Sequence, residues 1–256
     1  MTRARVSFVG AGPGDAELVT LKALRRVREA DAIIHDRLIP KELLDEAPAH
    51  AEIIDVGKAP GAAPVGQGQI NRLIVDAARR HRRVVRLKGG DPGIFGRLAE
   101  EIDAVRAAGV LFEIVPGVTA ATAAAARAGI SLTERGSAST VVLATGTGYT
   151  GATPESLDWS FLARVEGTLV FYMPVASLDT ITSTLMSLGR DPREPAMLVE
   201  AVGARDERVV AARLGQIADR AREADVRSPA LFITGPTVAA ASVPVAVRRV
   251  LAEAGS

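Results

Sequence analysis

The feature that most constrains the fold is an alternation, over the first 118 residues, of short apolar runs with longer amphipathic segments. The apolar runs have the length of strands and lie at 6–9, 32–35, 52–56, 84–87 and 112–115. The amphipathic segments lie at about 17–29, 40–46, 67–81 and 97–108. Strand–helix alternation of this kind predicts a mainly parallel sheet with helices on both faces.

The pattern changes after the alanine-rich segment 119–128. Strand-like runs then lie at 139–144, 168–173, 196–202, 208–214 and 229–234, with helical segments near 157–164, 177–188, 215–224 and 245–254. The five residues GARDE, a length typical of a hairpin loop, separate two of these runs. We therefore predict a mixed sheet here and two α/β domains in all. The expected ranges are 1–118 for the N-terminal domain, 119–138 for a connecting segment and 139–256 for the C-terminal domain.

Charge and residue counts argue against several classes of function. The 256 residues carry 31 basic and 30 acidic side chains, which gives no reason to expect a nucleic-acid or membrane partner. There is no cysteine, so disulfides, thiolate metal sites and cysteine nucleophiles are excluded. The first ten residues enter a strand-like run at once, without the apolar region of a signal peptide. We expect a cytoplasmic protein.

Glycine-rich turns follow three of the predicted parallel strands, at the edge where such sheets bind ligands. The turn GAGPGD resembles a dinucleotide-binding fingerprint, but its sixth position is Asp15, and Pro13 lacks a backbone N–H for a pyrophosphate. An NAD site is therefore disfavoured, although Asp36 stands near where a ribose-binding acid belongs. In KGGDP, Gly89 and Gly90 allow close backbone approach to a ligand. The two turns together favour a ligand site over plain helix starts.

Other catalytic arrangements find little support. The three histidines lack metal-ligand spacing, and no GxSxG motif is present. Asp36 and Arg37 follow a predicted strand, where they form either a charge pair or a contact with a substrate.

Three segments together resemble one enzyme family, the tetrapyrrole methylases, and within it the uroporphyrinogen-III C-methyltransferase branch. These are VGAGPGD to HDRLI at 9–39, VVRLKGGDPGIFGR at 84–97, and FEIVPGVTA to ISLT at 112–133. The resemblance implies two α/β domains with S-adenosylmethionine (SAM) bound in the cleft between them, no metal, and a homodimer. It also implies methyl transfer from SAM to carbons 2 and 7 of uroporphyrinogen III. The product, precorrin-2, leads to sirohaem and cobalamin.

The resemblance assigns roles to residues at the matching positions. Asp36 would serve in acid–base catalysis. Positive side chains would bind the carboxylates of the tetrapyrrole: Arg37, Lys58, Arg97 and Arg135. SAM would be contacted by Pro13, Gly89, Gly90, Asp91, Thr119, Ala120, Met173, Ala230 and one of Ala201 and Val202.

The chain departs from the family pattern mainly on the substrate side. Ala59 stands where the family usually has Arg, and Glu134 and Thr147 stand where it usually has His. Two alternatives therefore stay open beside uroporphyrinogen methylation. One is a methylase of a later corrinoid precursor such as precorrin-4, and the other is a weakly catalytic relative that binds tetrapyrrole.

Overall fold

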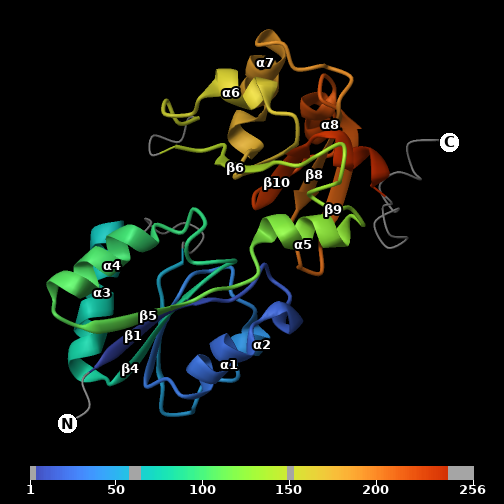
Figure 1. The fold of residues 1–256 in the computed structure, drawn as a ribbon. Helices are drawn as coiled ribbons and strands as arrows, with labels where there is room; N and C mark the ends of the chain where they lie inside the picture. Colours follow the sequence, from blue (N-terminus) through green and yellow to red (C-terminus); the bar gives the residue numbers. More distant parts are fainter. Residues whose placement is uncertain (1–3, 58–64, 149–152, 242–256) are drawn as a thin grey trace. The chain divides into compact units, whose positions relative to one another are not determined.

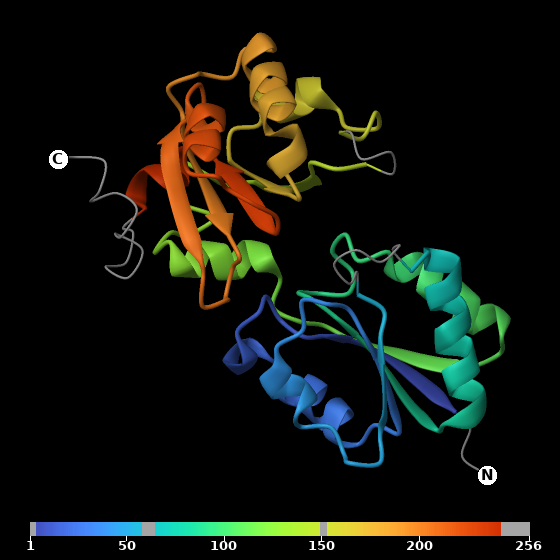
Figure 2. The same cartoon turned by 180° about the vertical axis from the view of Figure 1, so that it is seen from behind.

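A computed structural model describes residues 4–57, 65–148 and 153–241 of the chain. The chain divides into two compact units, residues 1–120 and 121–256, each built on its own five-stranded sheet (Figures 1 and 2). The predicted α/β class is confirmed in both units.

The first unit contains a wholly parallel sheet in the order β3-β2-β4-β1-β5. Its strands are β1 (Arg5–Gly10), β2 (Ala32–His35), β3 (Glu52–Asp55), β4 (Arg83–Lys88) and β5 (Leu111–Val115). All five coincide with the predicted apolar runs. Because every strand runs the same way, the loops that follow them lie along one edge of the sheet.

Helices cover both faces of this sheet. They are α1 (Leu21–Arg28), α2 (Lys41–Leu44), α3 (Gln67–Arg80) and α4 (Leu98–Ala107). Neighbouring strand residues point to opposite faces, so Ile33 packs in the core with α1 and α2, while Ile34 packs in the core with α3 and α4. The predicted segment 17–29 begins instead with a short 3-10 turn, and Thr20 caps α1 by accepting the Ala23 N–H.

The second unit contains a mixed sheet in the order β6-β7-β10-β8-β9, in which only β6 and β7 are parallel. Its strands are β6 (Val141–Thr145), β7 (Thr168–Tyr172), β8 (Pro195–Glu200), β9 (Arg208–Arg213) and β10 (Ala230–Thr234). Strands β8 and β9 form the hairpin that the short GARDE segment predicts.

Four α-helices belong to the described part of this unit: α5 (Ala120–Arg127), α6 (Trp159–Arg164), α7 (Leu178–Ser187) and α8 (Ile217–Glu223). Phe171 lies at the centre of the core, with ring centroids 6.2 Å from Trp159 and 5.9 Å from Phe232. The helix predicted near 245–254 lies outside the described residues. Among the described helices, none combines the length and apolarity needed to span a bilayer.

Candidate active site

The loops after β1, β4 and β5 meet through three glycines at one edge of the first sheet. A Cβ atom at Gly10 would lie 2.6 Å from both the Gly117 nitrogen and the Gly90 oxygen. A Cβ at Gly117 would lie 2.3 Å from the same Gly90 oxygen. Only glycine permits this approach of backbone to backbone. We call Gly10, Gly90 and Gly117 the three-glycine junction.

Backbone hydrogen bonds tie the first two of these loops together. The Gly90 N–H donates to the Gly12 oxygen at 2.6 Å, and the Gly12 N–H donates to the Gly90 oxygen at 3.3 Å. Gly12 and Gly90 have φ angles of +75° and +66°, in the left-handed region where a side chain is strained. The GAGPGD turn is therefore hydrogen-bonded to the KGGDP turn. The Gly12 N–H is used in this pairing, which agrees with the poor match of GAGPGD to a pyrophosphate-binding loop.

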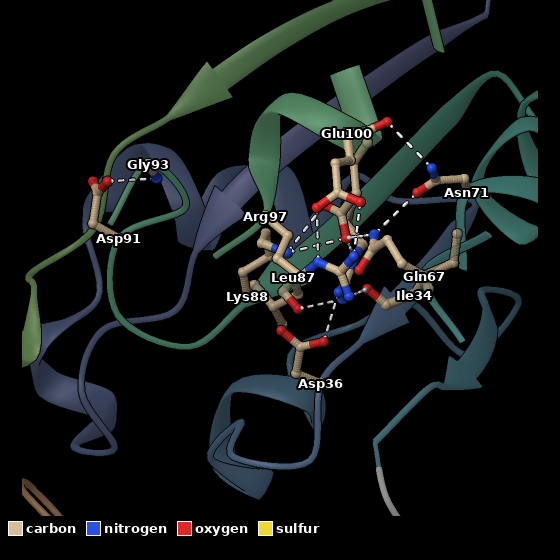
Figure 3. A network of polar contacts seen from close by, with 12 residues as sticks. Ile34, Asp36, Gln67, Asn71, Leu87, Lys88, Asp91, Gly93, Arg97 and Glu100 are labelled. Carbon is tan, nitrogen blue, oxygen red and sulfur yellow. Dashed lines mark hydrogen bonds and ion pairs between the residues drawn. The ribbon is translucent and has the colours of Figure 1, made fainter. Parts of the chain in front are cut away.

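Asp91 ties the KGGDP loop to the PGVTA loop. Its Oδ2 accepts the Gly117 N–H at 3.0 Å. Its Oδ1 accepts the Gly93 N–H at 2.8 Å, which Figure 3 shows. A carboxylate is well suited to this position, because both partners are donors. The side chain predicted to anchor SAM is thus engaged within the protein, and it shapes two of the predicted SAM loops.

Open space lies beside Gly89 and Gly90, two of the predicted SAM contacts. A Cβ added at Gly89 would meet nothing closer than Leu38 Cβ at 4.0 Å, and one at Gly90 nothing closer than the Ala120 nitrogen at 3.9 Å. Gly89 does not share the positive φ angle of Gly90. Gly89 is therefore not required by the fold, and its lack of a side chain leaves room for a ligand.

The remaining SAM contacts predicted in the first unit lie on the same loops. Pro13 follows β1 and is half-buried, whereas Asp15 accepts the Glu17 N–H and so caps a 3-10 turn. Thr119 and Ala120 follow β5 and are also half-buried. The structure thus brings the predicted positions Pro13, Gly89, Gly90, Asp91, Thr119 and Ala120 to one edge of one sheet.

Asp36 follows β2 at this edge and pairs with a buried arginine of β4. The Nη2 atom of Arg86 donates to Asp36 Oδ1 at 2.6 Å. The Asp36 side chain is 37% exposed, whereas that of Arg86 is 2% exposed. Asp36 therefore stands at the boundary between the core and solvent, with one oxygen held from the inside.

Arg86 belongs to a network of buried charges beneath the edge. Its Nε donates to Glu101 Oε1 at 3.0 Å, and the Lys88 ammonium lies 3.0 Å from both oxygens of Glu101. Gln67 of α3 also donates to Glu101, at 3.4 Å (Figure 3). Burial, followed by repulsion from Arg86, lowers the pKa of the Lys88 ammonium.

The predicted substrate-binding cations have different surroundings. Arg37 is exposed and lies against Gly57, where a Cβ would be 2.5 Å from Arg37 Cβ. Arg97 has a left-handed φ of 54° and forms a two-point ion pair with Glu100, with N–O distances of 2.8 and 2.7 Å. The Arg97 hydrogen bond lowers the pKa of the Glu100 carboxyl. Lys58 lies outside the described residues, as does Ala59.

In the second unit, three predicted SAM contacts lie at one end of the sheet. Met173 follows β7, Ala201 follows β8, and Ala230 begins β10 between those two strands. The Ala201 N–H donates to the Pro229 oxygen at 2.8 Å. Met173 and Ala201 both have left-handed backbones, with φ angles of 52° and 51°, which is uncommon for residues other than glycine.

Three further features of the second unit bear on the predictions. Val202, the alternative to Ala201, is buried, whereas Ala201 is half-buried with its left-handed backbone. Thr147, where the family usually has His, donates through Oγ1 to the Met173 oxygen at 2.8 Å. Arg135 is exposed in the turn between Glu134 and Ala138.

Comparison with known proteins decides the family. A model of the tetrapyrrole (corrin/porphyrin) methylases matches residues 5–218. The chain belongs to this family. Among solved structures, this tetrapyrrole methylase is similar to a uroporphyrin-III C-methyl transferase from Thermus thermophilus complexed with S-adenyl homocysteine. The two are 44% identical with a TM-score of 0.80, over 92% of this chain and 99% of that one.

Curated relatives of this tetrapyrrole methylase differ in length. The S-adenosyl-L-methionine-dependent uroporphyrinogen III methyltransferase of Methanosarcina barkeri is 42% identical, and the match covers 91% of this chain and 92% of that protein. The siroheme synthase of Pseudoalteromonas atlantica is 44% identical over 92% of this chain but only 51% of its own length. The chain thus spans about half the length of the siroheme synthases it matches. A cobalt precorrin-4 methyltransferase is 27% identical, with a TM-score of 0.81 over 91% of this chain.

Sequence reasoning missed several residues at the site of this tetrapyrrole methylase. Arg86 and Glu101 form the buried network, and Gly10 and Gly117 complete the three-glycine junction. One signal for Arg86 was available, since it is a charged residue inside the apolar run VVRL. No comparable signal marks Glu101, which follows Glu100 on an amphipathic helix.

Proposed function

We propose that this chain is a SAM-dependent C-methyltransferase that methylates uroporphyrinogen III at carbons 2 and 7 and yields precorrin-2. The observation that carries this proposal is the similarity to the Methanosarcina barkeri enzyme, at 42% identity over nine-tenths of both chains. The first unit supports it, because three strand-end loops that the family motifs place around SAM meet at one edge. Precorrin-2 would be used for sirohaem or cobalamin.

The residues at this edge fit SAM as methyl donor. Gly89 has open space beside it, so the backbone can approach a ligand there. Asp91 links the KGGDP loop to the PGVTA loop, and the Gly12–Gly90 hydrogen bonds link the KGGDP loop to the GAGPGD loop. The positions Pro13, Gly90, Thr119 and Ala120 therefore lie on three connected loops. When bound, SAM supplies an activated methyl group, so the protein needs no nucleophilic side chain.

Asp36 is proposed as the residue that acts on the substrate. Methylation of a pyrrole carbon leaves a cationic ring, and a carboxylate nearby can stabilise that cation or accept the proton that is later lost. Arg86 holds one oxygen of Asp36 from the core side. The exposed part of the carboxylate is left to meet the tetrapyrrole.

From the second unit we propose contacts to SAM by Met173, Ala201 and Ala230, with Val202 as the alternative to Ala201. Their support is the convergence of three strand ends and the left-handed backbones of Met173 and Ala201. Non-glycine residues in that conformation collect at functional sites, where the surrounding structure holds the strain.

Cations are proposed to bind the carboxylates of the tetrapyrrole, since charge-assisted hydrogen bonds to carboxylates are strong. The candidates are Arg37, Lys58, Arg97 and Arg135. Of these, Arg37 and Arg135 are exposed, and Arg97 would have to share its guanidinium with Glu100.

The organisation of the protein is also part of the proposal. We propose the domain ranges 1–118 and 139–256 with a connecting segment at 119–138, a homodimer, and a cytoplasmic location. Only the methylase step is claimed, because the siroheme synthases are about twice the length of the matched region.

Two alternatives are tested by the same reaction. A methylase of a later corrinoid precursor such as precorrin-4 is favoured less, because the cobalt precorrin-4 methyltransferase is 27% identical rather than 42–44%. A weakly catalytic tetrapyrrole-binding relative is suggested by the departures at Ala59, Glu134 and Thr147.

The deciding experiment incubates the purified protein with SAM and enzymatically made uroporphyrinogen III. Precorrin-2, or its fluorescent trimethylated by-product, together with S-adenosylhomocysteine, supports the proposal. Tetrapyrrole binding without SAM consumption supports the weakly catalytic alternative. Methylation of a precorrin-4 substrate but not of uroporphyrinogen III supports the sister enzyme.

A further inference from the structure

We propose that Arg86 is a positioning residue for Asp36: clamped by Glu101 in the core, it fixes one carboxylate oxygen and leaves the other for the substrate. The inference rests on the proposed function, in which Asp36 acts on the tetrapyrrole. It assigns a task to the most deeply buried charges of the first unit.

All three nitrogens of the Arg86 guanidinium have different partners. Nε donates to Glu101 at 3.0 Å, Nη1 to the Leu87 oxygen at 3.2 Å, and Nη2 to Asp36 at 2.6 Å. Because the guanidinium is planar and rigid, the two bonds to the core, at Glu101 and at the Leu87 oxygen, already orient its plane. The Nη2–H is therefore directed towards Asp36 by bonds that do not involve Asp36.

The two oxygens of Asp36 are not equivalent. Oδ1 accepts the short bond from Arg86, and Oδ2 forms no hydrogen bond with any residue that the structure describes. The side chain is 37% exposed, so the second oxygen has access to solvent. A carboxylate held by one oxygen presents the other in a defined direction, which is what a group acting on a bound ring requires.

Stability alone does not account for this arrangement. Glu101 is 0% exposed and Arg86 is 2% exposed, and moving both charges out of water costs free energy that their attraction recovers only in part. Apolar residues of similar volume would serve the core of a sheet as well or better. The buried Arg86–Glu101 pair is therefore not explained by stability alone, and the contact of Arg86 with Asp36 supplies a further role for it.

The charge balance of the buried network includes Asp36. Two buried cations, Arg86 and Lys88, share the one buried carboxylate of Glu101. Among the described residues, Asp36 provides the second carboxylate in contact with these cations. The network is thus neutral only when Asp36 is included, and its outer charge lies at the exposed edge.

The test is a double-mutant cycle on turnover with SAM and uroporphyrinogen III. The variants are Arg86→Met, Asp36→Asn and the double variant, with Arg86→Lys as a second, milder change. We expect Arg86→Met to lower kcat by about 10- to 100-fold, the usual effect of losing a residue that orients a catalytic group. SAM affinity, measured by calorimetry, should change less than about 3-fold, and the double variant should be no slower than Asp36→Asn.

Arg190→Lys is the matched control. Arg190 is a buried arginine of the second unit, and it pairs with Glu194 and donates to the Leu162 oxygen at 3.0 Å. Its hydrogen-bond partners belong to the core of the second unit, so its replacement should leave kcat within about 3-fold. Arg86→Lys keeps a positive charge beside Glu101, but its donors all sit on one nitrogen, so it lacks the planar fork that reaches Glu101, the Leu87 oxygen and Asp36 together. It serves in the cycle if Arg86→Met does not fold.

The outcomes separate the inference from the proposed function. No methylation by the unaltered protein refutes the proposed function itself. If the unaltered protein is active, unchanged kcat in both Arg86 variants overturns the positioning role. So does a double variant slower than Asp36→Asn by the full Arg86→Met factor, because the two residues would then act independently. Full activity of Asp36→Asn overturns both the role of Asp36 and that of Arg86.

Discussion

Asp91 and Gly117 are joined by a hydrogen bond of 3.0 Å from the Gly117 N–H to Asp91 Oδ2. The bond links the loops after β4 and β5, and Asp91 uses its other oxygen to hold Gly93. A residue that the family motif assigns to SAM therefore has a second duty within the protein.

Replacing Asp91 with Ala should weaken SAM binding by at least about 10-fold, because both loops lose a charge-assisted hydrogen bond of about 1.5–3 kcal/mol. Asp91→Asn should also weaken it, since an amide nitrogen would face one of the two N–H donors. Calorimetric titration with S-adenosylhomocysteine measures the change. Asp103→Ala is the control, because Asp103 is exposed and pairs with Arg106 on the same helix. Unchanged affinity in Asp91→Ala would contradict the assignment.

Two glycine replacements should differ in what they change, one lowering stability and the other SAM affinity. Gly10→Ala places a methyl group 2.6 Å from the Gly117 nitrogen and the Gly90 oxygen, so we expect a loss of about 1–3 kcal/mol or more in unfolding free energy. Gly89→Ala meets nothing closer than 4.0 Å, so stability should change by less than about 1 kcal/mol while SAM affinity falls. Urea unfolding and calorimetry measure the two effects. A Gly89→Ala protein that binds SAM normally would mean that no ligand lies beside Gly89.

Removing Glu101 should destabilise the first unit strongly. Glu101→Leu leaves the Arg86 and Lys88 charges buried without their shared carboxylate, an arrangement that typically costs about 3–5 kcal/mol. Glu100→Ala, one residue earlier and half-exposed, should cost less than about 1 kcal/mol. Urea unfolding of both variants tests this prediction. Equal stabilities would show that the buried network is not maintained in solution.

Acid should weaken the fold through Glu113. Hydrogen bonds from Arg26, Lys22 and Ser7 lower the pKa of this carboxyl from 4.5 to about 2. A lowered carboxyl pKa contributes stability that is complete above about pH 4.5 and is lost as the pH falls towards 2. After allowance for partial exposure, we expect Glu113→Gln to lose about 1–2 kcal/mol at pH 7.

The pH dependence of this stability loss checks its assignment to Glu113. The difference in unfolding free energy between the unaltered protein and Glu113→Gln should shrink steadily between pH 4.5 and pH 2. Glu223→Gln, on the exposed side of α8, is the control. A difference that is constant over this range would show that the Glu113 contacts do not perturb its titration.

The sheets could be predicted from the sequence because their signals are local. Runs such as 6–9 and 84–87 are apolar and of strand length, and alternating helices require parallel pairing. The five-residue GARDE segment likewise restricts β8 and β9 to a hairpin. Motif positions such as Gly90 and Asp91 could be placed at a sheet edge for the same reason, since strands of known direction end there.

The charge network could not be predicted, because it depends on register between distant segments. Arg86 and Asp36 are 50 residues apart, and their contact follows from β2 lying beside β4. The motif predicts the same role for Gly89 and Gly90, whereas of the two only Gly90 has a positive φ angle. The motif also predicts that Asp91 faces a ligand, but its bonds to Gly117 and Gly93 depend on a loop geometry that no local pattern encodes.

The three-glycine junction determines which parts of this edge can be redesigned. Gly10 and Gly117 admit no side chain without displacing backbone, so any library aimed at a different acceptor should keep them, together with Gly90. Gly89 and the exposed Leu38 beside it carry no such constraint. A library at this edge should therefore randomise the codons of Gly89 and Leu38 and leave the rest of the scaffold unchanged.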